Sequence, residues 1–138
     1  PYKQWSEEGN LIIQGQFENS MTGLWEFWNT KGVKVMEIEF SDNLPNGYCN
    51  MWYSSPGKEG NKKIQCSFRK GRHGGKYTAW YGDGKLRVEA TLDRGSIVDV
   101  QMYDKDGATV LDEKSSQKIF EKQLEADLEL LREVERDI

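Results

Sequence analysis

The residues of this 138-residue chain that are best suited to chemistry gather in one basic stretch, FRKGRHGGK. The stretch holds Arg69, Lys70, Arg72, Lys76 and the chain's only histidine, His73. Clustered cations of this kind can bind phosphate groups and other anions. The competing interpretation is a solvated loop between strands. It is favoured because residues 1–111 carry 14 acidic and 14 basic side chains and are neutral as a whole.

Patterns typical of catalysis or metal binding are missing from the sequence. One histidine leaves little scope for a histidine-based metal site or a Ser-His pair. Cys49 and Cys66 lack the spacing of a zinc motif. Glu37 and Glu39 alternate on one strand-like segment, which suits a solvated face. The GRHGG segment lacks the spacing of a phosphate-binding loop. We therefore expect no enzymatic activity, no cofactor and no metal.

The elements that must position these residues repeat along the chain. A turn glycine recurs every 23 to 28 residues, and an aromatic residue precedes each one. The glycines are Gly9, Gly32, Gly60, Gly84 and Gly107, and the aromatics are Trp5, Trp28, Trp52, Trp80 and Tyr103. The longest unit contains extra residues in SSPGKEGN, which predicts a longer turn. Copies in register over residues 1–111 indicate a repeat protein.

Each unit has the pattern of a β-hairpin. Asp83-Gly84 is a preferred pair for a two-residue type I′ turn, and apolar residues alternate with polar ones after each turn. Such a turn sets the strand register. The register predicts three facing pairs, namely Tyr77 with Ala90, Trp25 with Ile38, and Cys49 with Cys66. Two small buried thiols are favoured over a disulfide, which would require an oxidising compartment.

The aromatic residues fall into two stripes. Trp5, Trp28, Trp52, Trp80 and Tyr103 occupy one position in successive units, whereas Trp25, Phe27 and Tyr77 lie on alternate positions. Because successive side chains point to opposite faces of a sheet, at least one stripe must form the core. The other is a candidate surface for a peptide, a carbohydrate or the C-terminal helix. The candidate partner-binding residues are Trp28, Trp52, Trp80, Tyr103 and the basic stretch, although packing alone is the favoured role for the stripe.

The repeated units resemble MORN-type repeats. The segments GLWEFWNTKGVKVMEIEF, GYCNMWYSS and GKYTAWYGDGKLRVEATL are most similar to the bacterial subtype related to YwqK. In that subtype G-x-W-x-x-W/Y-Y-x-x-G precedes an alternating strand. The resemblance covers nearly all of residues 1–111. The chain departs from the motif in its longer turn, in Cys49 at an aromatic position and in an eroded fifth unit.

The resemblance implies consecutive hairpins laid side by side as one antiparallel sheet that acts as an interaction module. Some MORN-type proteins are proposed to bind phospholipid headgroups, and some YwqK-type proteins are described as antitoxins. The family offers no catalytic residue to carry over. Choline-binding cell-wall repeats are also similar, but the longer period and the charged strand faces here favour the first family.

Residues 112–138 change period and predict an amphipathic helix. Its apolar stripe is Phe120, Leu124, Leu128 and Leu131, with Ile119, Val134 and Ile138 beside it. Ser115 or Ser116 can cap its start. Packing of the stripe on one face or one end of the sheet is the favoured role. The alternatives are a coiled coil with a second copy, which Gln117 and Asp127 would interrupt, and the start of a longer helix.

These patterns together predict an all-β fold with an open, single-layer antiparallel sheet of about five hairpins over residues 1–111. One C-terminal amphipathic helix follows over residues 112–138. The predicted function is non-enzymatic protein–protein interaction or scaffolding. The alternative is binding of anionic phospholipid headgroups or cell-wall glycan. We expect a protein partner and no nucleic acid, and a homo-oligomer through the helix is a further option.

The compartment stays open. No apolar run approaches the roughly 18 residues needed to span a membrane, and no signal peptide or lipidation motif is visible. The chain begins with Pro1 rather than Met, as an excised piece would. The cytoplasm is slightly favoured.

Overall fold

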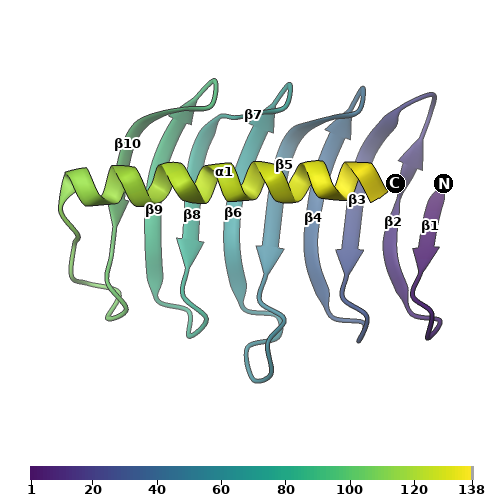
Figure 1. The fold of residues 1–138 in the computed structure, drawn as a ribbon, viewed down its shortest axis with the longest axis horizontal. Helices are drawn as coiled ribbons and strands as arrows, with labels where there is room; N and C mark the ends of the chain where they lie inside the picture. The colour runs from purple at the N-terminus through teal and green to yellow at the C-terminus, as the bar shows by residue number, and fades with distance from the viewer. Residues whose placement is uncertain (138) are drawn as a thin grey trace.

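The computed structural model describes the backbone of residues 1–137 and the side chains of residues 1–134. These residues form one open antiparallel sheet, crossed by one helix (Figure 1). The elements are β1 (Tyr2–Trp5), β2 (Leu11–Phe17), β3 (Met21–Trp28), β4 (Lys34–Ser41), β5 (Leu44–Trp52), β6 (Lys62–Arg69), β7 (Arg72–His73), β8 (Gly75–Trp80), β9 (Leu86–Asp93), β10 (Ser96–Met102) and α1 (Glu113–Asp137). Neighbours in the sheet follow chain order, except that the short β7 pairs only with β6. The predicted fold class is confirmed.

The hairpin turns at the lower end of the strands in Figure 1 differ from the predicted type. In the β8–β9 turn, the Tyr81 N–H donates to the Lys85 carbonyl (2.8 Å) and the Gly84 N–H donates to the Tyr81 carbonyl (2.9 Å). Gly84 has a φ of 92°, whereas Asp83 is not in the left-handed region. The loop therefore contains three residues and ends on a left-handed glycine, so the prediction of a two-residue type I′ turn is wrong. The β1–β2 and β3–β4 turns have the same hydrogen bonds.

A β-bulge beside each of these turns restores the predicted register. The pairing moves from Ala79 with Val88 to Trp80 with Leu86, so that Arg87 is skipped. Equivalent shifts occur at the first three repeated tryptophans. The loop has one residue more than predicted, and the bulge absorbs it. The facing pairs are therefore the predicted ones, Tyr77 with Ala90, Trp25 with Ile38 and Cys49 with Cys66.

The remaining turns complete the repeat. The β5–β6 turn spans residues 54–60 and is closed by a hydrogen bond from the Tyr53 N–H to the Asn61 carbonyl (2.9 Å), which confirms the predicted longer turn. The fifth unit ends in a single bridge between Tyr103 and Val110, as its eroded sequence indicated. The β4–β5, β6–β7 and β9–β10 turns, at the upper end of the strands, are of a second kind that was not predicted. Asp42-Asn43, Lys70-Gly71 and Arg94-Gly95 have positive φ at both positions, as in a two-residue type I′ turn.

One face of the sheet carries the core. Trp25 (0% exposed), Phe27 (6%) and Tyr77 (0%) point to this face, so the alternate stripe is the core stripe. The Trp25 indole lies directly over β2, where a Cβ at position 15 would fall 2.1 Å from a ring carbon. Only glycine fits under this ring, and Gly15 therefore belongs to the packing of Trp25.

Helix α1 crosses the core face roughly perpendicular to the strands, from β10 towards β3 (Figure 1). Phe120, Leu124 and Leu131 are buried against the sheet, and Leu128 and Val134 are partly buried. The favoured role of the predicted stripe is thus confirmed, although Ile119 is 47% exposed and Ile138 lies outside the described residues. A search of the described chain for a helix long and apolar enough to cross a membrane finds none.

The helix begins differently from the prediction. The Asp112 carboxylate caps it by accepting a hydrogen bond from the Ser115 N–H (2.9 Å), so neither Ser115 nor Ser116 is the cap. Hydrogen bonding to Ser115 holds the pKa of Asp112 below its usual value. Ser116 is buried instead, 1% exposed, within the first turns of the helix.

A buried polar contact fixes the helix over β8. The Tyr77 hydroxyl donates to Asp127 Oδ2 (2.6 Å), Gln123 donates to Asp127 Oδ1 (2.9 Å), and the rings of Tyr77 and Phe120 meet edge-on at 4.9 Å. Burial raises the pKa of Asp127, while the hydrogen bonds from Tyr77 and Gln123 oppose that rise. Burial, followed by the Asp127 charge, raises the pKa of Tyr77. Asp127, which would interrupt a coiled coil, thus serves as an anchor within the chain.

Substitution of Gly15 by alanine tests the packing of Trp25. We expect Gly15→Ala to lower the free energy of unfolding by about 1–3 kcal/mol, because the added methyl group collides with the indole. The matched control is Gly74→Ala, where a Cβ has nothing within 4 Å and φ is not left-handed. Urea denaturation measures both variants, and equal destabilisation would contradict this account.

A double-mutant cycle tests the anchor of the helix. We expect Tyr77→Phe to cost about 1–3 kcal/mol in the wild-type chain, because it leaves a buried carboxylate short of a donor. In an Asp127→Leu background the same substitution should cost less than about 0.5 kcal/mol. Chemical denaturation gives the coupling energy, and an unchanged cost in the two backgrounds would show that this hydrogen bond does not hold the helix.

Candidate functional site

The repeated aromatics lie on the face that α1 leaves uncovered. Side chains alternate along each strand, so Trp28 and Trp52 point away from their buried neighbours Phe27 and Met51. Trp5 is 55% exposed, and the others are half-buried. We call Trp5, Trp28, Trp52, Trp80 and Tyr103 the aromatic row, and the surface that carries it the open face. The structure thus brings the predicted aromatic candidates together on one surface.

Side chains of the returning strands lie between the rings of the aromatic row. Leu11 pairs with Trp5, Lys34 with Trp28, Lys62 with Trp52 and Leu86 with Trp80. Lys34 Nζ is 5.5 Å from the ring centroid of Trp52, and Lys62 Nζ is 5.8 Å from that of Trp80. Cation–π attraction therefore links each lysine to the ring of the next repeat.

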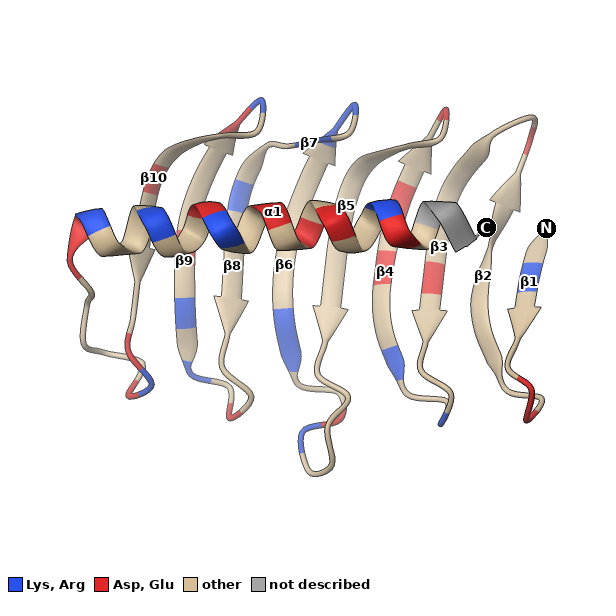
Figure 2. Cartoon of the chain, viewed as in Figure 1, with Lys and Arg blue, Asp and Glu red and all other residues tan. Residues whose placement is uncertain are grey.

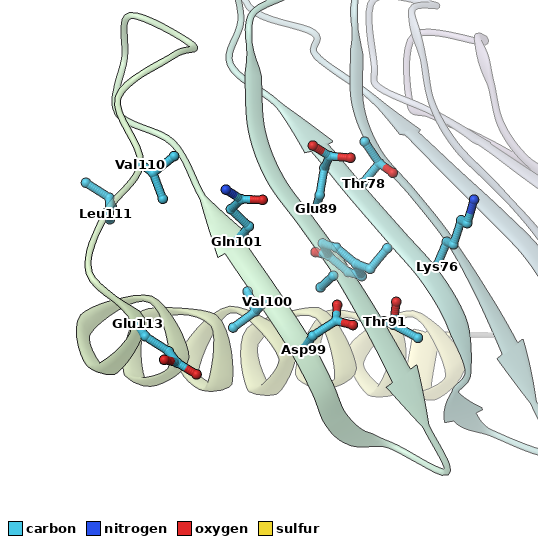
Figure 3. A pocket seen from close by; sticks show the side chains of 12 residues that line it. Lys76, Thr78, Glu89, Thr91, Asp99, Val100, Gln101, Val110, Leu111 and Glu113 are labelled. Carbon is cyan, nitrogen blue, oxygen red and sulfur yellow. The ribbon is translucent and has the colours of Figure 1, made fainter.

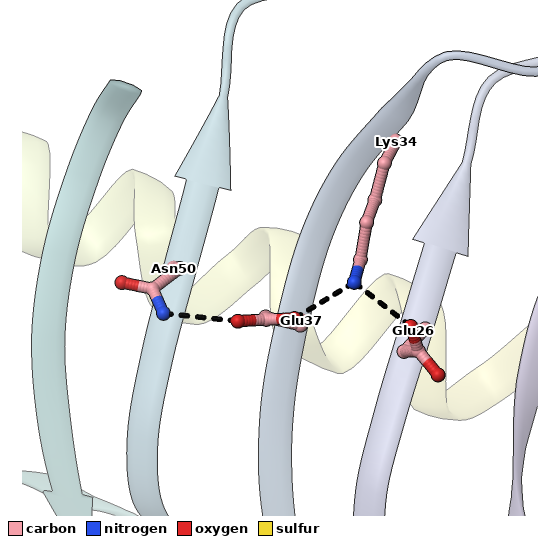
Figure 4. A network of polar contacts seen from close by, with 4 residues as sticks. All are labelled: Glu26, Lys34, Glu37 and Asn50. Atoms are coloured by element: carbon pink, nitrogen blue, oxygen red, sulfur yellow. Dashed lines mark hydrogen bonds and ion pairs between the residues drawn. The ribbon is translucent and has the colours of Figure 1, made fainter. Parts of the chain in front are cut away.

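Lys34 also joins a polar network beside the row (Figure 4). Its Nζ donates to Glu26 Oε2 and Glu37 Oε2, both at 2.8 Å, and Asn50 donates to Glu37 Oε1 at 3.1 Å. Burial acts to raise the pKa of Glu37, but the bonds from Lys34 and Asn50 outweigh it and leave this pKa below its usual value. Burial acts to lower the pKa of Lys34, and its bonds to Glu26 and Glu37 raise it overall. Glu37 is thus an ion-pair partner within the sheet.

Hydrogen bonds between repeats hold the rings in line. The Tyr53 hydroxyl donates to the Trp80 carbonyl and the Tyr81 hydroxyl donates to the Tyr103 carbonyl, both at 2.7 Å. In each case the tyrosine follows the tryptophan of one unit and binds the backbone of the next. The Trp-Tyr dipeptides in MWYSS and AWYGD are the sequence signal for this link, which was not predicted.

The basic stretch divides into surface and core. Arg69, Lys70 and Arg72 are exposed at the β6–β7 turn, where they line an open cavity of about 780 Å³. Arg94, from the β9–β10 turn, joins them there and was not predicted. Arg94-Gly95 repeats the pattern of Lys70-Gly71, and this was the available signal. Figure 2 shows basic residues at these two upper turns, with an acidic residue beside them at the β9–β10 turn, and acidic residues at the upper turns nearer the N-terminus.

His73 faces the core and is 2% exposed. Its ring centroid lies 4.4 Å from that of Phe68 and 5.9 Å from that of Tyr77. Burial lowers the pKa of His73 to about 4, so the imidazole is neutral at pH 7. The basic cluster at the upper turns therefore consists of Arg69, Lys70, Arg72 and Arg94, and His73 is not part of it.

Lys76 lines a different cavity, on the open face above β8, β9 and β10 (Figure 3). This cavity measures about 670 Å³, and Val110 forms part of its wall. Lys76 and Thr78 from β8 and Glu89 from β9 line it, as Figure 3 shows. Tyr103 donates to Glu89 Oε1 (2.8 Å), and this bond raises the pKa of Tyr103. The cavity thus continues the open face beside the last ring of the aromatic row.

The other groups with chemical potential have structural surroundings. Cys49 and Cys66 are free thiols, 0% and 5% exposed, and the hydrogen bond of the Cys66 thiol to Cys49 together with burial raises the pKa of Cys66. Asp106 accepts N–H bonds from Ala108 and Thr109, and its contacts with Thr109 hold its pKa at about 2. Within the described residues, no group of three or more His, Cys, Asp or Glu side chains is placed to hold a metal ion.

No family model, no curated protein and no solved structure matches this chain. The similarity of its units to MORN-type repeats therefore stays a prediction that rests on the repeated residues themselves.

Burial of His73 predicts a pH dependence of stability. Its pKa is about 4 in the folded state and about 6.5 when unfolded, so the unfolded chain binds more protons between these values. The free energy of unfolding should therefore fall by up to about 3 kcal/mol as the pH drops from about 6.5 to 4.

A His73→Phe variant, which keeps an aromatic ring beside Phe68, should lose this slope in urea denaturation measured across the same pH range. Asp127 has a raised pKa and so contributes a slope of the opposite sign in both proteins, which the comparison cancels. Parallel pH profiles for the two proteins would show that His73 does not titrate as its burial requires.

Proposed function

We propose that this chain is a non-enzymatic, MORN-like repeat module that binds a protein partner on the open face. The position of the aromatic row carries the proposal, because these rings lie on the face opposite α1 and the core. Aromatic side chains are enriched at protein interfaces, where they supply large contact areas with few rotatable bonds. The stripe that contains Trp25 and Tyr77 packs in the core. Among the described residues no element covers the aromatic row on the opposite face.

The open face is pre-organised for recognition. The hydroxyl bonds of Tyr53 and Tyr81 join neighbouring repeats, and Asn61 adds a link to the Gly82 carbonyl (2.9 Å). A surface that is already ordered loses little conformational entropy when a partner binds. This supports a scaffold that holds its contact residues at fixed spacing.

A second candidate function is the binding of anionic phospholipid headgroups or an anionic cell-wall glycan. It is favoured by one observation, the convergence of Arg69, Lys70, Arg72 and Arg94 on the cavity at the upper turns. Among the described residues Asp93 is the only acidic one that lines this cavity, so the local charge is positive although the chain carries −4. Guanidinium groups suit phosphate and carboxylate oxygens.

Two variants separate these functions. In a row variant, Trp28→Ala with Trp52→Ala, we expect loss of a protein partner that the wild-type chain captures from a cell extract. A turn variant, Arg69→Glu with Arg72→Glu, should retain that partner. Circular dichroism and thermal unfolding check that both remain folded. The captured protein is then identified, purified and titrated against all three chains.

Vesicles that contain anionic phospholipid test the second function with the same chains. The second function would be supported by vesicle binding that disappears in high salt and in the turn variant. If, in addition, the row variant loses no protein partner that the wild-type chain captures, the second proposal replaces the first. Capture that is equal for wild type and row variant would reject the open face as the contact surface.

A further inference from the structure

The rings of the aromatic row are spaced by the sheet itself. Trp28, Trp52 and Trp80 stand at the same level of β3, β5 and β8, with one strand between each pair. Hydrogen-bonded strands lie about 4.8 Å apart, so successive rings are about 9.6 Å apart across the sheet. From Trp5 to Tyr103 the row therefore extends about 38 Å, perpendicular to the strands.

This spacing matches one type of ligand backbone. A polyproline II helix has three residues per turn and rises about 3.1 Å per residue, so every third residue returns to one side after about 9.3 Å. Twelve residues span about 37 Å, which keeps such a helix in step with all the rings of the row. We propose that the partner of the open face is a proline-rich segment in the polyproline II conformation, lying along the aromatic row. This inference rests on the proposed function and names the chemical class of its partner.

Other backbones do not keep this step. An α-helix returns to one side after seven residues, or about 10.5 Å, and over the length of the row it would run out of register by nearly 4 Å. A β-strand presents one side every second residue, about 6.8 Å, and would normally add to a sheet edge rather than lie across a face. The step between rings thus selects the polyproline helix by geometry.

The row also offers the hydrogen-bond donors that such a ligand needs. In the described chain the indole N–H groups of Trp28, Trp52 and Trp80 have no acceptor, whereas the indole of the core residue Trp25 donates to the Thr22 carbonyl (3.1 Å). The buried side-chain polar atoms that lack a partner belong to Asn50, His73 and Ser116. The indole nitrogens of the row are not among them, so these nitrogens are accessible to solvent. A polyproline II helix leaves its own carbonyls unbonded and can accept from them.

Charge refines the identity of the segment. Of the side chains paired with the tryptophans of the row, Lys34 and Lys62 are ionised, and Glu89 lies beside Tyr103 at the end of the row. Lys34 is already paired with two carboxylates, whereas Lys62 has only Gln65 Oε1, at 3.5 Å, as a hydrogen-bond partner within the described residues. An acidic residue of the ligand, placed between two prolines and beside Lys62, would form an ion pair with the Lys62 ammonium group. The ligand class is therefore a proline-rich segment with an acidic residue beside Lys62.

A pair of synthetic peptides tests this inference. Both have about 13 residues, the same composition and fluorescent labels, with aspartate and serine as spacers. One carries proline at every third position and the other at every fourth. Fluorescence anisotropy with the full chain should show at least tenfold tighter binding of the first peptide. Equal affinities, or no binding at millimolar peptide, would overturn the inference.

Variants of the chain locate the site. Trp52→Ala should weaken binding of the every-third-residue peptide at least tenfold, and Trp52→Phe should give a smaller loss, since it keeps a ring but removes the N–H. Tyr48→Ala is the matched control, because Tyr48 is a 42% exposed aromatic that alternation places on the same face but outside the row. An equal loss in Tyr48→Ala and Trp52→Ala would also overturn it. If the peptide fails while a row-dependent protein partner is captured, the polyproline inference falls and the proposed function stands.

Discussion

Strand register is the constraint on which this structure depends. Side chains alternate along a strand, so a slip of one residue would carry Trp25 and Tyr77 to the open face and bring the aromatic row beneath α1. Two devices hold the register together at the β1–β2, β3–β4 and β8–β9 turns. A three-residue loop ends on a left-handed glycine, and a bulge at the neighbouring tryptophan takes up the extra residue. Because both devices recur with the repeat, each unit places its aromatic residue at the same level.

A single helix divides the sheet into two faces with different energetics. The core face gains from burial of apolar side chains against α1 and from the contact between Tyr77 and Asp127. The open face is held by cation–π contacts and by the ion pairs of Lys34, which contribute less each because they are partly hydrated. The fold therefore draws its stability mainly from one face, and side chains on the other are less constrained by packing.

The sequence predicted the features that follow from its periodicity. It did not predict the features that follow from tertiary contacts between elements. The repeat spacing predicted the hairpins and the facing pairs, and the change of period in residues 112–138 predicted the helix with Phe120 on its buried side. The loop type could not be predicted, because Asp83-Gly84 suits both kinds of turn and the bulge that decides between them leaves no local signal. The burial of His73 and Asp127 depends on where α1 crosses the sheet, which no local pattern of residues specifies.

The same limit applies to the candidate site. Two aromatic stripes were visible, but which one is core is decided by the face that α1 covers. The hydrogen bonding of the indole N–H then distinguishes the tryptophan of the core from the tryptophans of the row. Leu11 and Leu86 occupy positions between the rings of the row, so aliphatic side chains are compatible with its packing. An indole adds an N–H that requires an acceptor. Trp25 satisfies this requirement inside the chain, whereas Trp28 and its equivalents present theirs to solvent. Water accepts from these N–H groups in the free chain, and the ligand that we propose would replace that water with carbonyls at the spacing of the strands.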